Sequence, residues 1–170
     1  MNLDLITTRM SQNGDAVRGL VKGVSMEQAL WQQAPDKWSM VEIVSHLADE
    51  EREDFRTRLD LLLHHPGQTW PGIDPQGWSQ ERGYRDRDLQ ESLEDFLSER
   101  QSSIAWLRTL QEPRWDNIYQ HPLLGEIKAG SILTSWLTHD LLHIRQLTKL
   151  HFDYFSRQTK PYSGDYAGKW

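Results

Sequence analysis

The segment that most constrains the fold lies near the end of the chain, in residues 131–150. Apolar residues and two histidines recur there at steps of three and four, namely Leu133, Trp136, His139, His143, Leu147 and Leu150. This spacing is typical of one face of an α-helix, so both imidazoles belong to the stripe that faces the interior. Burying an imidazole without a polar partner is costly, and a pair one helical turn apart is able to bind one divalent ion.

Three other segments show the same periodicity. We predict helices over residues 3–22, from Ser39 to about residue 64, and from Asp88 to about residue 110, besides the last helix from Ser131 to about Leu150. The second helix has the best-marked start, because Ser39 and Glu42 have the spacing of a capping box. A short helical turn is predicted over residues 25–31. No segment alternates as a strand does, so the sequence predicts an all-α fold.

The connections between these helices differ in length. Residues 64–87 contain three prolines and four glycines, which exclude a long helix there. A four-helix bundle with one long crossover is a known arrangement, and here the crossover joins the second and third helices. Residues 111–130 are predicted to be irregular, and residues 151–170 to form a tail that packs as a strap or stays partly loose. The whole chain, residues 1–170, is expected to be one domain.

Composition excludes several classes of function. The net charge of −6 argues against binding to nucleic acid or to an anionic membrane surface. No apolar run is long enough to span a membrane, and the first residues lack the features of a signal peptide, so we expect a cytoplasmic protein. The chain has no cysteine, so any metal must be held by His, Asp or Glu, and any thiol must arrive with a substrate.

Two motifs resemble the DinB-like superfamily. They are Trp38-Ser39-x-x-Glu42-x-x-x-His46-Leu47 on the second helix and His139-x-x-x-His143-Ile-x-Gln146 on the fourth. The resemblance implies an up-down-down-up four-helix bundle in which His46, His139 and His143 hold one divalent metal. It also implies a small-molecule substrate, since members include S-transferases and a maleylpyruvate isomerase that use bacillithiol, mycothiol or glutathione. Dimers are common in the family, so a homodimer is expected.

The residues themselves leave alternatives open. His139 and His143 are also explained as histidines packed in a core. Periodicity does not place His46 at the centre of the apolar face of its helix. The acidic helix edge beside His46 either lines a polar cleft or faces water. Only the resemblance assigns His46 to the metal. We read His64, His65 and His151 as facing solvent, and Arg145 as either meeting an anionic substrate or lying along the surface.

Three imidazoles leave a divalent ion with an open position, which is typical of a catalytic site. Zn, Ni or Fe suits such ligands, and the ion lowers the pKa of a bound water or thiol. Glu42, Glu50 and Asp140 are candidates to accept a hydrogen bond from the second N–H of a histidine ligand. Glu50 or Asp49 is a candidate general base near the metal. Together with the activities that the resemblance implies, this chemistry leads us to expect a metal-dependent S-transferase or isomerase. The alternative is a metal-binding or structural module that acts through dimerisation without turnover.

Overall fold

The computed structural model is a four-helix bundle, and it describes residues 1–168 and 170. The first long helix is α1, Leu3–Val21. The second is continuous through α3 (Met40–Asp49), the π-helix η1 (Glu50–Arg56) and α4 (Thr57–His64). The third is α6, Leu89–Thr109, and the fourth is α7, Ala129–Gln158. None of the helices in the described residues is both long enough and apolar enough to cross a membrane.

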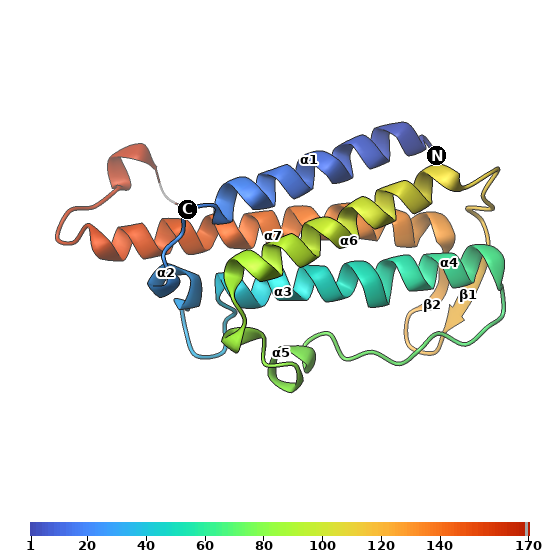
Figure 1. Cartoon of the computed structure of the whole chain (residues 1–170), viewed down its shortest axis with the longest axis horizontal. Coiled ribbons are helices and arrows are strands. Elements are labelled where there is room, and N and C mark those ends of the chain that lie inside the picture. The colour runs from blue at the N-terminus through green and yellow to red at the C-terminus, as the bar shows by residue number, and fades with distance from the viewer. Residues whose placement is uncertain (169) are drawn as a thin grey trace.

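The helices follow the expected up-down-down-up order. In Figure 1, α1 and α7 run in one direction, while α3–α4 and α6 run in the other. Because α3–α4 and α6 are parallel, residues 65–88 return along the outside of the bundle, as Figure 1 shows. This crossover contains the short helices α5, Trp78–Glu81, and η2, Tyr84–Asp86. It is the long connection that the prolines and glycines predicted.

A polar layer divides the core into two apolar clusters. One cluster surrounds Leu47, Phe96 and Leu147, and the other surrounds Leu59 and Trp136. Between them each long helix contributes buried polar side chains, among them Asn13, His46, Asp49, Glu50, Glu51, Arg100, Asp140 and His143. Buried polar groups are costly unless they are paired, so this layer is the part of the core that needs a specific explanation.

The predicted helix starts are confirmed where side chains cap them. Ser39 and Glu42 form the capping box of α3, and Asp88 accepts hydrogen bonds from the first amides of α6. Ser25 caps the short helix α2, Met26–Leu30. These side chains satisfy the amide groups that a helix leaves free at its start, and a local sequence pattern is enough to reveal them.

The start and end of the last helix differ from the prediction. Residues 111–130 are not all irregular, because β1 (Ile118–His121) and β2 (Gly125–Lys128) form an antiparallel hairpin. The chain enters α7 from this hairpin, and the amides of Ala129 and Gly130 donate to the carbonyls of Asn117 and Trp115. These bonds replace a side-chain cap, so α7 begins two residues before Ser131. The helix also continues to Gln158, into the predicted tail, before the short helix η3, Asp165–Ala167.

Candidate metal centre

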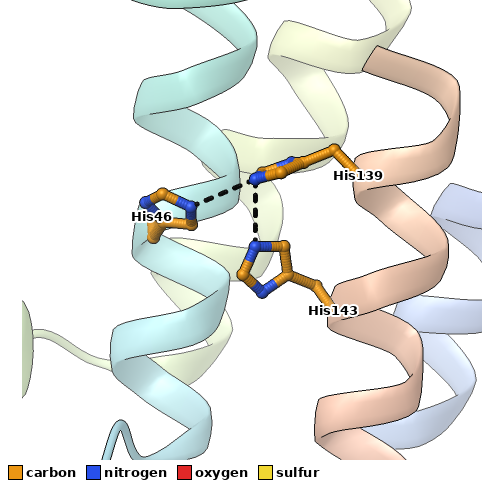
Figure 2. A group of neighbouring side chains, drawn as sticks. All are labelled: His46, His139 and His143. Atoms are coloured by element: carbon orange, nitrogen blue, oxygen red, sulfur yellow. Dashed lines mark hydrogen bonds between the residues drawn. The ribbon is translucent and has the colours of Figure 1, made fainter. Parts of the chain in front are cut away.

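Three imidazoles converge in the polar layer between α3 and α7. The Nε2 atom of His139 lies 3.4 Å from Nε2 of His46 and 3.1 Å from Nε2 of His143. Figure 2 shows the ring of His46 reaching across from the facing helix, with all three rings turned toward one another. Ligand nitrogens about 2.0–2.1 Å from a tetrahedral zinc ion are about 3.3–3.4 Å apart. The two distances are close to this spacing, and one potential ligand atom from each histidine lies within 4.8 Å of the others.

His46 is buried, which decides against the second of the two alternatives for its helix edge, a face toward water. Its exposed fraction is 5%, because every residue of α3 is buried between the other helices and the loops around them. Trp38 covers part of the site, with its ring centroid 4.7 Å from that of His46 and nearly parallel to His143. The bundle and the indole therefore bury His46 and cover one side of the site.

The surroundings favour neutral imidazoles at pH 7. Burial, and then the neighbouring histidines, lower the pKa of His46 to about 2. Burial is also the main cause that lowers the pKa of His139 to about 3, and it lowers the pKa of His143. A neutral imidazole keeps a lone pair on one nitrogen, which is the form that binds a metal.

The far nitrogens of two histidines face oxygen atoms. The Nδ1 atom of His143 lies 3.0 Å from Oε1 of Gln146. The Nδ1 atom of His46 lies 4.0 Å from Oε1 of Glu50, and both atoms are buried without a hydrogen-bond partner. Metal-binding histidines usually donate this second N–H to a carbonyl or a carboxylate. The donor set, the Gln146 contact and the unpartnered Nδ1 and Oε1 atoms therefore fit a divalent metal bound through the three Nε2 atoms.

Glu50 stands at the first residue of the π-helix η1. A π-turn inside an α-helix is rare in proteins, and where one occurs it often lies at a functional site. Burial, and then the charge of Asp54, raise the pKa of Glu50 to about 9. The carboxyl group thus lies next to a histidine of the site in a poorly solvated position.

The other carboxylates named from the sequence have partners away from the three imidazoles. Asp49 accepts hydrogen bonds from the Tyr84 hydroxyl and from Arg82 and Arg52. Glu42 accepts from Ser39 in the capping box, and Asp140 accepts from Arg100. The geometry therefore favours Glu50 over Glu42 and Asp140 as a support for a ligand, and Glu50 over Asp49 as the acidic group nearest the site.

Two residues, Gln146 and His151, have contacts that the sequence prediction assigned differently or not at all. Gln146 was part of the quoted motif but had no role, although its position three residues after His143 places both on one helix face. Of the histidines read as solvent-facing, His64 and His65 are exposed. His151 is half-buried instead, since it contacts the carbonyl of Leu20 and the amide of Gln28.

A pocket of about 420 Å³ reaches the site from the surface. It is lined by Trp38, His143 and Gln146 and by the exposed residues Asp36, Lys37 and Gln76. The loop before α3 and the crossover both contribute to it. The volume suits a small molecule, and a substrate in this pocket lies next to one of the three imidazoles.

Comparison with known proteins identifies the family. The model of the DinB superfamily matches residues 9–147. The chain belongs to the DinB superfamily. No curated protein matches its sequence.

A solved structure of the same superfamily fold supports the observed topology. This is YfiT from Bacillus subtilis, described as a probable metal-dependent hydrolase with an unusual four-helix bundle topology. Its TM-score is 0.78 at 22% sequence identity, over 92% of this chain and 86% of that one. The four-helix bundle predicted from the resemblance is therefore confirmed for this DinB-superfamily chain.

The contact between Gln146 and His143 leads to a first prediction. Replacing Gln146 with leucine removes the oxygen that Nδ1–H of His143 donates to, while the size of the side chain changes little. We expect metal affinity to fall about 10- to 100-fold. Competition with a chromophoric chelator measures this affinity, and circular dichroism checks the helices. Gln101→Leu, on the exposed side of α6, is the control. An equal affinity in the two variants would contradict the support role.

Proposed function

We propose that this DinB-superfamily protein is a metal-dependent hydrolase of small molecules, in which His46, His139 and His143 hold one divalent ion. The observation that carries the proposal is the convergence of three imidazole nitrogens beside an open pocket. YfiT, with the same fold, is described as a probable metal-dependent hydrolase, which supports hydrolysis as the first reaction to test.

Three protein ligands favour catalysis over a structural role. Structural zinc sites usually have four protein ligands, whereas catalytic sites keep a position for water or substrate. In the described residues, the group with metal-binding geometry contains three side chains. An ion held there lowers the pKa of bound water to about 7, which supplies a nucleophile at neutral pH.

The residues around the ligands hold them and shape the pocket. Gln146 orients the ring of His143, and Glu50 is placed to do the same for His46. Trp38 covers His46 on the loop side and forms one wall of the pocket. The exposed residues Lys37 and Gln76 contribute polar groups to the lining of the pocket.

Thiol transfer is the second candidate, and it rests on the family resemblance. A small thiol suits the same open position, because a divalent ion also stabilises a thiolate. The chain has no cysteine, so the thiol would be a co-substrate. A metal-binding module that acts through dimerisation is the alternative without turnover.

The test uses protein loaded with Zn²⁺, Ni²⁺ or Fe²⁺ in separate samples and stripped with a chelator in another. We expect para-nitrophenyl esters to be hydrolysed only by loaded protein, with activity restored when the metal is returned. A parallel assay offers bacillithiol, mycothiol or glutathione with an electrophilic acceptor. Conjugation without hydrolysis would favour S-transfer. Neither reaction with any metal would favour the module without turnover.

A second prediction separates two roles of Glu50. Glu50→Gln keeps an oxygen near His46 but removes the ionisable carboxyl group. If Glu50 supports the ligand, metal affinity falls about 10- to 100-fold. If it transfers a proton, the rate of loaded protein falls about 10²- to 10⁴-fold while affinity is nearly unchanged. We expect the loss of affinity, because Glu50 faces Nδ1 of His46. Parallel measurements of kcat and metal affinity decide between the two, with Glu53→Gln as the control.

A further inference from the structure

A second hollow adjoins the pocket at the three histidines. It has a volume of about 400 Å³, and we call it the basic groove, lined by Gln33, Leu142, Arg145, Gln146, Lys149 and Trp170. Gln146 lines both hollows and also contacts His143. The basic groove therefore begins where the pocket at the candidate metal centre ends.

The two hollows follow one side of α7. His139, Leu142, Gln146 and Lys149 are spaced by three, four and three residues, which places them along one helix face. Leu142 lies between the polar residues and is 57% exposed, so this stretch of the face offers an apolar surface. A molecule that starts at the histidines and extends along this face passes Leu142 and reaches the two cations.

The charge of the groove depends on Arg145. Lys149 forms an ion pair with Asp153, which also accepts a hydrogen bond from Gln33, so its charge is largely compensated. Among the described residues, no carboxylate lies within ion-pair distance of the Arg145 guanidinium, although the chain as a whole carries a charge of −6. A planar guanidinium with free donors binds a carboxylate through two hydrogen bonds.

We infer that the basic groove binds a carboxylate at the far end of the substrate, an inference that rests on the proposed function. A single uncompensated cation matches the single charge of a carboxylate better than the double charge of a phosphate. His139 and Arg145 are six positions apart in α7, which is about 9 Å along the helix axis. The substrate class is therefore an ester or amide whose reactive bond is separated from a terminal carboxylate by an extended apolar chain.

Matched esters test this assignment in metal-loaded protein. One is para-nitrophenyl octanoate, and the other is the mono-para-nitrophenyl ester of suberic acid, which has a carboxylate at the end of a chain of equal length. We expect kcat/KM to be about 10- to 100-fold higher for the ester with the carboxylate. Arg145→Gln should remove this preference by lowering kcat/KM for the ester with the carboxylate much more than for the octanoate. Arg157→Gln, on the exposed last turn of α7, is the control.

Binding without turnover gives an independent measurement. Calorimetry compares suberate with the neutral diol of the same length, using wild-type protein, Arg145→Gln and Arg157→Gln. We expect suberate to bind more tightly than the diol, with a loss of about 10-fold or more in Arg145→Gln alone. Selective binding of suberate without hydrolysis of either ester would support the basic groove and overturn the proposed hydrolase. Equal behaviour of both ligands, or equal losses in both variants, would overturn the groove assignment.

Discussion

Replacing His139 with alanine is expected to reduce the bound metal from about one equivalent per chain to background, because too few ligands remain. His139 is the central member of the group, with its Nε2 atom within 3.4 Å of a nitrogen on each of the other two. The variant lacks the imidazole whose Nε2 atom lies close to both His46 on α3 and His143 on α7. Elemental analysis of protein purified without a histidine tag measures the change.

The matched control for His139 is His64→Ala. His64 is exposed and pairs with Asp60 on the surface of α4, so its loss should leave metal content unchanged. Circular dichroism should show intact helices in both variants, since the two apolar clusters lie on either side of the site. Full metal content in the His139 variant would refute the assignment of the three ligands.

Replacing Arg100 with methionine is expected to destabilise the fold by about 3–5 kcal/mol. Arg100 is 2% exposed. Its guanidinium donates hydrogen bonds to the carboxylate of Glu51, to the carboxylate of Asp140 and to the carbonyl of Met10. Trp136 and Asn13 also donate to these carboxylates, so one network joins all four long helices. Methionine fills similar space but leaves two buried carboxyl groups without their cation.

This loss is large beside the total stability of a domain, which is about 5–15 kcal/mol. Urea denaturation followed by circular dichroism measures it as a lower midpoint. Arg18→Met is the control, because Arg18 pairs with Asp15 on the exposed face of α1. That pair should contribute about 1 kcal/mol or less. A similar midpoint in the two variants would show that the buried network does not hold the helices together.

The sequence by itself determined the four long helices and most of their bounds. The hydrogen bonds of an α-helix join residues four apart, so its stripe and its caps are local signals. Ser39 with Glu42, Asp88, and the spacing of His139 and His143 belong to this kind of information. The family resemblance added the third histidine and the order of the helices, which periodicity alone did not supply.

The tertiary structure decided which side chains meet. Helical periodicity indicates the face on which a residue lies, but not what covers that face. His46 is buried because α3 is surrounded on all sides. Asp49 and Glu50 are neighbours in the chain, yet Asp49 is bonded to Tyr84 from the crossover, while Glu50 faces His46. Such contacts join residues that are far apart in sequence, or they depend on how whole helices pack against one another. They therefore exist only once the bundle has formed.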